Sequence, residues 1–202
     1  MTMRVVSLSG AVATGALLLT AGCGGATIGQ NISGAPGAGA VGTAPSGQPS
    51  GTFNQADVIF AQMMLSHHRQ AIDMAKLADT RASSKEVKDL ASKIEAEQRT
   101  QIKTLQTMLR SWGKPMPTDG MRPDMPGAMS EQDMAQLQKA KGAEFDKAFL
   151  HMMMAHHLGA ITMARTEEAQ GANPQAKELA KKIATEQQAE VEQMKQILDE
   201  IQ

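Results

Sequence analysis

Apolar residues recur every three to four positions through two parts of the chain, residues 54–112 and 143–201. This spacing is typical of amphipathic helices. It predicts four long helices, at about 54–82, 83–112, 143–169 and 174–202, and a short helix at 131–140. We therefore expect an all-α domain.

The residues that begin these segments support the assignment. Asn54 and Asp57 form a cap pair for the first helix. Ser83 and Glu86 have the spacing of a capping box, which opens the second. The dipeptide Asn173-Pro174 places a cap and a first-turn proline at the start of the last helix.

The two periodic parts are copies of one another. The motif Met-Met-x-x-His-His-x-x-Ala-Ile-x-Met-Ala occurs at residues 63–75 and again at 152–164. The offset of 89 holds through 53 aligned pairs that begin with Asp57 and Asp146, and 18 of these pairs are identical. This is an internal duplication. Each copy predicts a helical hairpin, and two packed hairpins predict a four-helix bundle.

The N-terminus indicates export. Residues 1–22 contain Arg4 and then a short apolar stretch, which is too short for a stable membrane span and reads as a signal peptide. Small residues precede Cys23, the single cysteine, and resemble a bacterial lipoprotein cleavage box. We expect an acylated Cys23 that anchors the chain to the extracytoplasmic side of the membrane. The alternative is ordinary signal cleavage with an incidental cysteine.

The rest of the chain divides into a linker and one domain. Residues 23–52 are mostly Gly, Ala, Ser, Pro and Thr with almost no charge, which predicts a disordered, flexible tether. Residues 53–202 are enough for one domain with its own core. The net charge is -1 and aromatic residues make up 2% of the chain. The chain therefore lacks the basic and aromatic residues typical of a nucleic-acid-binding protein. The sequence does not indicate which protein it would bind.

A helical wheel separates the histidines of each motif. With Phe60 at the centre of the apolar stripe, His67 lies about 20° from it and His68 about 80°. His67 and its copy His156 are therefore predicted to point into the bundle. His68 and His157 are predicted to flank it, toward a neighbouring helix.

Two glutamines lie on the apolar seams of the second helices of the hairpins. Gln98 and Gln187 occupy equivalent positions in the two copies. A buried amide without a partner costs about 1–3 kcal/mol. We therefore expect Gln98 and Gln187 to orient His67 and His156.

Methionine is unusually frequent, with 16 residues among 202. Thioether and imidazole are soft and borderline ligands that suit copper, and thioethers favour Cu(I) over Zn(II). The candidate ligands in the motifs are His67, His68, His156, His157, Met63, Met64, Met74, Met152, Met153 and Met163. The alternative is that the methionines fill gaps in the core and the histidines are ordinary buried residues.

The connection between the repeats, residues 113–142, is rich in Pro and Gly and carries further methionines. A packed core does not require methionine in a polar connection. We therefore treat four of them as additional candidate metal ligands: Met116, Met121, Met125 and Met129.

These motifs resemble the exported bacterial proteins of the domain of unknown function 305 family. The resemblance extends over nearly all of residues 54–201. It implies a ferritin-like helical bundle, and some members are similar to periplasmic copper-binding proteins. The family pattern has Glu three residues after the seam glutamine, which Glu190 retains and Gln101 replaces in the first repeat.

Three functions remain open on this sequence. The first is copper binding for buffering, chaperoning or resistance, with silver as another candidate metal. The second is a structural or interaction lipoprotein whose His-His pairs are hydrogen-bonded parts of the core. The third is a ferritin-like oxidase, but the Glu-x-x-His pairs of that chemistry do not occur in the chain. We therefore expect a protein that is not an enzyme.

Overall fold

The computed structural model describes residues 51–118 and 125–201. The predicted signal peptide, Cys23 and almost all of the linker lie outside these residues. The described part contains five helices and no strand, which confirms the all-α prediction. They are α1 Gln55–Arg81, α2 Lys85–Ser111, α3 Glu131–Lys139, α4 Ala143–Gln170 and α5 Pro174–Glu200. None of the helices in this part is both long and apolar enough to cross a membrane.

Most helix starts agree with the sequence. Asn54 accepts hydrogen bonds from the first turn of α1 while the side chain of Asp57 accepts one from the Asn54 N–H. Asn173 caps α5, with Pro174 in its first turn. The prediction for α2 was wrong by one residue, since Ser84 rather than Ser83 is its N-cap. The backbone and hydroxyl of Ser83 instead donate to Asp146 on α4.

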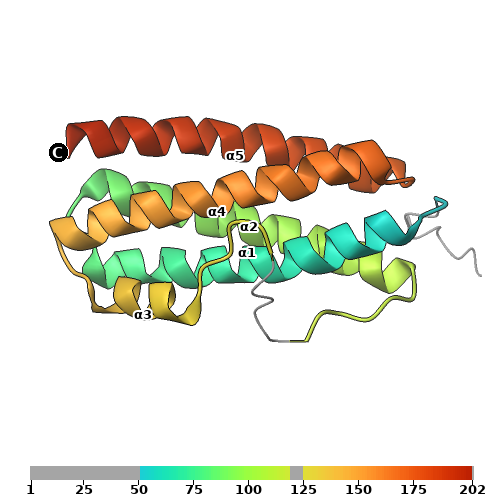
Figure 1. Cartoon of the computed structure of the whole chain (residues 1–202), viewed down its shortest axis with the longest axis horizontal. Helices are drawn as coiled ribbons and strands as arrows, with labels where there is room; N and C mark the ends of the chain where they lie inside the picture. Colours follow the sequence, from blue (N-terminus) through green and yellow to red (C-terminus); the bar gives the residue numbers. More distant parts are fainter. Residues whose placement is uncertain (1–50, 119–124, 202) are drawn as a thin grey trace, which may run out of the picture. The chain divides into compact units, whose positions relative to one another are not determined.

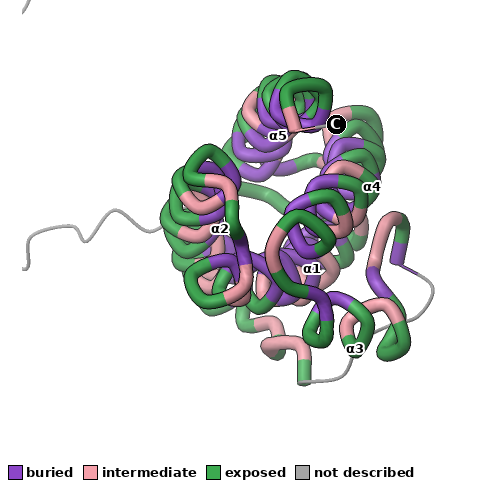
Figure 2. Tube along the Cα trace, turned by 90° about the vertical axis from the view of Figure 1, so that its left-hand side faces the viewer, coloured by how far each residue is buried: buried purple, intermediate pink, exposed green. Residues whose placement is uncertain are grey.

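The helices form two hairpins that meet through their first members. α1 packs along α2, α4 packs along α5, and α1 also contacts α4, with which it runs antiparallel (Figure 1). The end view shows the buried sides of the four long helices turned toward one another (Figure 2). The two helices that carry the His-His motifs are therefore neighbours.

A pair of aspartates joins each hairpin to the other. Asp57, at the start of α1, accepts backbone hydrogen bonds from residues 172–173, which form the turn before α5. Asp146, at the start of α4, accepts them from residues 83–84, the turn before α2. Both carboxylates are buried. The duplicated aspartate thus ties each hairpin to the turn of its partner.

The apolar core forms two clusters. One contains Met64 and Met163 and the other contains Met74 and Met153. Each cluster therefore contains motif methionines from both repeats. In the antiparallel α1–α4 pair, the histidines lie between the two clusters along the helix axes.

Candidate metal centre

Four histidines form a buried layer at the middle of the α1–α4 contact. His67 and His68 on α1, and His156 and His157 on α4, are all 0% exposed. The rings of His67 and His156 stack with their centroids 3.6 Å apart and their planes at 33°. The two inward histidines therefore meet across the pseudo-two-fold axis, a relation that the sequence left open.

The flanking histidines turn toward the second helix of their own hairpin, as the helical wheel predicted. His68 Nε2 lies 2.5 Å from Gln101 Oε1 on α2. His157 Nε2 lies 2.8 Å from Glu190 Oε2 on α5. Gln101 and Glu190 are equivalent positions of the two repeats. The same contact is thus made once to an amide and once to a carboxylate.

These partners determine which ring nitrogen carries the proton. A carboxylate only accepts, so His157 donates from Nε2 to Glu190. The Gln101 amide nitrogen donates to Glu186, which turns its oxygen toward His68, so His68 also donates from Nε2. His67 donates from Nε2 to the Pro126 carbonyl at 3.1 Å. In the neutral form of these three rings, the Nδ1 atom therefore carries a free lone pair.

The described residues provide no hydrogen-bond partner for those lone pairs. Nδ1 of all four histidines is buried and makes no hydrogen bond. Unpaired polar atoms are uncommon in a protein core and call for an explanation. A neutral imidazole nitrogen with a free lone pair is the form that coordinates a metal ion.

Burial keeps three of the four rings, those of His67, His68 and His156, neutral. Burial, and then the neighbouring His68, lower the pKa of His67 to about 3. Burial also lowers the pKa of His68 to about 4, and it holds the pKa of His156 well below its usual range. Burial alone would raise the pKa of Glu190, but the hydrogen bond from His157 lowers it. At neutral pH His67, His68 and His156 are therefore uncharged donors, and the Glu190 carboxylate lies beside the layer.

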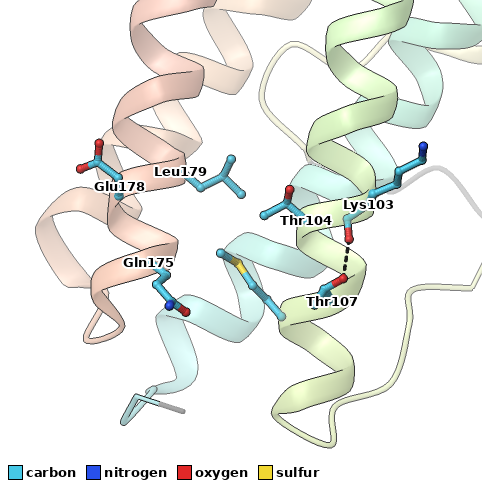
Figure 3. Close-up of a pocket in the computed structure, with 7 residues that line it drawn as sticks. Lys103, Thr104, Thr107, Gln175, Glu178 and Leu179 are labelled. Carbon is cyan, nitrogen blue, oxygen red and sulfur yellow. Dashed lines mark hydrogen bonds between the residues drawn. The ribbon is translucent and has the colours of Figure 1, made fainter. Parts of the chain in front are cut away.

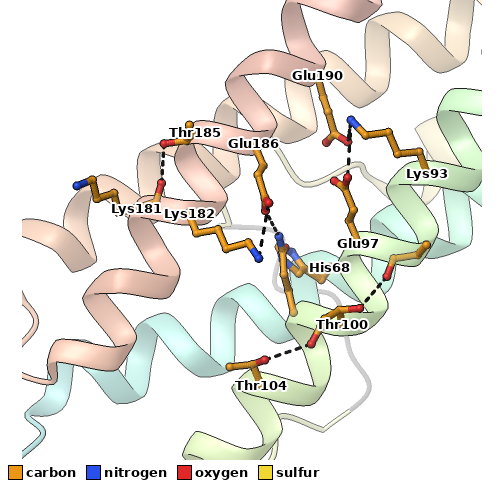
Figure 4. A network of polar contacts seen from close by, with 12 residues as sticks. His68, Lys93, Glu97, Thr100, Thr104, Lys181, Lys182, Thr185, Glu186 and Glu190 are labelled. Atoms are coloured by element: carbon orange, nitrogen blue, oxygen red, sulfur yellow. Dashed lines mark hydrogen bonds and ion pairs between the residues drawn. The ribbon is translucent and has the colours of Figure 1, made fainter.

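A polar network connects the layer to the surface between α2 and α5 (Figure 4). Lys93 on α2 lies 3.4 Å from Glu190 on α5 and also contacts Glu97. On the other side, Glu186 on α5 accepts from the Gln101 amide and contacts Lys182. The network bridges α2 and α5, which pack much less closely against each other than each packs against its hairpin partner.

The opposite side of the layer is covered by the connection between the repeats, residues 125–129. Gln70 on α1 exchanges two hydrogen bonds of 2.8 Å with the backbone of Met129. Gly159 on α4 allows the backbone to approach, because a Cβ there would lie 2.0 Å from the Pro126 oxygen. The connection therefore packs directly over His67.

This packing corrects our reading of the connection. Met125 and Met129 are buried, at 4% and 8% exposure, so the core does use methionine there. Met116 is half-buried and packs against a core cluster. Met121 lies outside the described residues. The position of these methionines in a polar segment is thus not by itself evidence for metal binding.

The methionines of the motifs divide by their distance from the histidines. Met64 and Met153 are fully buried and lie one helical turn from His67 and His156. Met74 and Met163 are seven residues from the same histidines, about 10 Å along the axis. Met63 and Met152 are partly buried. Of the six, Met64 and Met153 are best placed to join the histidines in one site.

The predicted role of the seam glutamines is not what the structure shows. Gln98 and Gln187 are both buried, but neither amide hydrogen-bonds to His67 or His156, or to any other described residue. The residues that hold histidines are instead Gln101 and Glu190, one turn further along each helix. The family pattern pointed to position 190, but the helical pattern alone did not.

The donor set fits a soft metal ion, although the site is not preformed. Among the described residues, no group of three or more His, Cys, Asp or Glu side chains is arranged to hold a metal. Two imidazoles on one tetrahedral ion, with metal–nitrogen distances of about 2.0 Å, hold their centroids about 5 Å apart. The stacked rings of His67 and His156 are closer than that. A shared ion would therefore require at least one of these rings to rotate.

A separate groove of about 520 Å³ lies on the surface between α2 and α5 (Figure 3). Lys103, Thr104 and Thr107 line one side, and Gln175, Glu178 and Leu179 line the other. The groove contains no histidine, and among its lining residues only Met108 carries sulfur. We do not include it in the candidate metal centre.

Comparison with known proteins identifies relatives over the helical part of the chain. The family model described as domain of unknown function (DUF305) matches residues 57–198. A DUF305 fragment from Deinococcus radiodurans is 32% identical, with a TM-score of 0.69, and the match covers 74% of this chain and 99% of that one. A Streptomyces coelicolor DUF305 protein, assigned as secreted, is 28% identical, with a TM-score of 0.67 and coverage of 72% and 93%. No curated protein matches the sequence.

A copper-bound structure is also similar. CopM in its Cu(II)-bound form is 34% identical, with a TM-score of 0.64, and the match covers 71% of this chain and 96% of that one. CopM in the Cu(I)-bound form gives 32% identity and a TM-score of 0.61 over the same 71% and 96%. CopM has also been solved in Ag-bound forms.

Proposed function

The chain belongs to the DUF305 family, and we propose that it binds copper outside the cytoplasm through its histidine layer. The observation that carries this proposal is the set of four buried imidazoles whose Nδ1 atoms have no hydrogen-bond partner in residues 51–118 and 125–201. Their low pKa values keep His67 and His68 neutral and ready to coordinate at neutral pH. A protein that only needed a stable core would gain more from apolar side chains at these positions.

The ligands would be imidazole nitrogens of the layer, with the thioethers of Met64 and Met153 beside them. Copper, when bound, supplies a soft cation that these neutral donors prefer to a hard one. The protein's own contribution is to keep the donors uncharged, dry and close together. The CopM structures with Cu(I), Cu(II) and Ag support this choice of metal, and they leave silver as a second candidate cargo.

The setting that we propose is an exported lipoprotein. Cys23 would carry the lipid, residues 24–52 would form the tether, and the helical part would be a ferritin-like four-helix bundle of two fused hairpins. The secreted assignment of the Streptomyces coelicolor relative supports export. The role is binding for buffering, chaperoning or resistance, and we propose no catalytic step.

A structural role is the second candidate function. It is favoured by the partners that three of the histidines already have within the chain: Pro126, Gln101 and Glu190. In that case the layer would specify how the hairpins pack and would have no ligand. It would leave the unpaired Nδ1 atoms unexplained.

A Cu(I) titration of the purified protein against a chromophoric competitor tests the proposal. The control is a double variant, His67→Ala with His156→Ala, measured beside His151→Ala, which alters an exposed histidine outside the layer. We expect tight binding by the wild type and by His151→Ala, and its loss in the double variant. Equal affinity in all three proteins would contradict the proposal.

A further inference from the structure

The two halves of the histidine layer differ at one contact. The amide of Gln101 receives the Nε2–H of His68, and the carboxylate of Glu190 receives the Nε2–H of His157. Amide and carboxylate have nearly the same shape, and both partners are buried, at 5% and 2% exposure. The difference between the halves is therefore one negative charge.

That charge acts on the donor atom of His157. When a carboxylate accepts the proton-bearing side of an imidazole, it fixes the ring orientation and makes the opposite nitrogen a stronger donor. The opposite nitrogen is Nδ1, which has no partner among the described residues. An amide oxygen fixes the same orientation but adds no charge. The second-repeat half therefore presents the stronger imidazole donor.

The charges around Glu190 leave this effect in place. From α2, the ammonium of Lys93 lies 3.4 Å from Glu190 Oε1, and Glu97 adds a second carboxyl nearby. From α4, His157 is the group in contact. Burial, and then the hydrogen bond with Glu190 and its negative charge, raise the pKa of Glu97. One lysine therefore faces two carboxyl groups, so it does not cancel the negative side of the site.

We propose that Glu190 is a positioning residue that makes the His157 half of the layer the preferred site for a divalent copper ion. The matching Gln101 places an uncharged amide against His68, which makes that half better suited to the monovalent ion. A 2+ ion gains more than a 1+ ion from a carboxylate behind its ligand in a buried site. This inference rests on the proposed copper function. It adds that the two halves of the layer prefer different oxidation states of the ion.

Reciprocal exchange of the two residues provides the test. Glu190→Gln makes the second half match the first, and Gln101 shows that a glutamine at this position holds the imidazole in the same way. Gln101→Glu makes the first half match the second. Cu(II) and Cu(I) affinities are measured by competition for the wild type and both variants, with the Cu(II) electron paramagnetic resonance spectrum as a second readout.

We expect Glu190→Gln to lower the Cu(II) affinity by about 10–100-fold. The Cu(I) affinity should change by much less, and the Cu(II) spectrum should shift. Gln101→Glu should raise the Cu(II) affinity of the first half and add a second spectral component. Equal losses for both ions, or no change in either, would overturn the inference while leaving copper binding intact. A wild type that binds neither ion would overturn the proposed function as well.

Discussion

The two repeats keep the same residues where they face each other and differ where they face the connection. His68 and His157 occupy equivalent positions, and so do Asp57 and Asp146, which tie each hairpin to the turn of the other. In contrast, Gln70 of the first repeat corresponds to Gly159 of the second. The pseudo-two-fold symmetry is thus preserved at the axis and lost at one outer face.

The connection explains that loss. It occurs once in the chain, so a single segment covers the α1–α4 face. The residues that contact it on α1 and on α4 therefore differ. Gln70 binds the backbone of Met129, and Gly159 makes room for the carbonyl of Pro126. Only His67 then gains a carbonyl partner from the connection. The single connection thus adds a second difference between the halves to the one that Gln101 and Glu190 make.

Removing an aspartate that is equivalent in the two halves should have the largest effect on stability. Asp146→Ala leaves the backbone N–H groups of residues 83–84 without their charged acceptor, and we expect a loss of about 3 kcal/mol. Asp57→Ala should cost a similar amount, because it releases residues 172–173 in the same way. Urea unfolding measures both. The exposed Asp73→Ala is the control, and an effect no larger than that of the control would contradict the symmetric role.

Replacing Gly159 with alanine should have the next largest effect on stability. Gly159→Ala would place a Cβ 2.0 Å from the Pro126 oxygen, so the connection must move. We expect a loss of about 1–3 kcal/mol. An ordinary helical glycine gains up to about 1 kcal/mol on the same change, so the sign itself is diagnostic. Thermal unfolding of Gly159→Ala, compared with that of Thr162→Ala at an exposed position one turn away, shows whether the change is destabilising.

The last prediction concerns the pH dependence that comes from a carboxyl group present in only one repeat. Glu167 on α4 corresponds to Ala78 in the first repeat and is buried beside Asp57. Burial, and then Asp57, raise the pKa of Glu167 from 4.5 to about 8. The folded state therefore holds a proton that the unfolded state loses, and stability falls as the pH rises from about 4.5 to about 8.

Glu167→Gln should remove this contribution. The variant should gain stability relative to the wild type between pH 5.5 and pH 8.5, since the amide does not ionise. The buried histidines make the folded protein less stable in acid, because the folded pKa values of His67 and His68 lie below 6.5. They contribute equally to both proteins, so the difference in unfolding free energy isolates Glu167. A difference that is the same at both pH values would show that Glu167 ionises normally.

The sequence predicted what depends on a single helix. The apolar period located the long helices, the cap residues located most of their starts, and the wheel showed that His67 points inward. The sequence did not predict which residues of different helices are in contact. The partners of His68 and His157 depend on the axial position of α2 and α5 relative to α1 and α4. The spacing of apolar residues within one helix does not determine that position. The burial of Met125 and Met129 depends on the fold of a connection that has no period at all.

Stability with and without copper tests the central claim most directly. An ion that binds the folded state raises its apparent stability, by about 2.7 kcal/mol when the free ion is at 100 times its dissociation constant. We predict that saturating Cu(I) raises the unfolding midpoint of the wild type and raises that of the His67→Ala/His156→Ala variant much less. If the variant is destabilised to the same extent with and without copper, the histidine layer is a structural element and does not bind the ion.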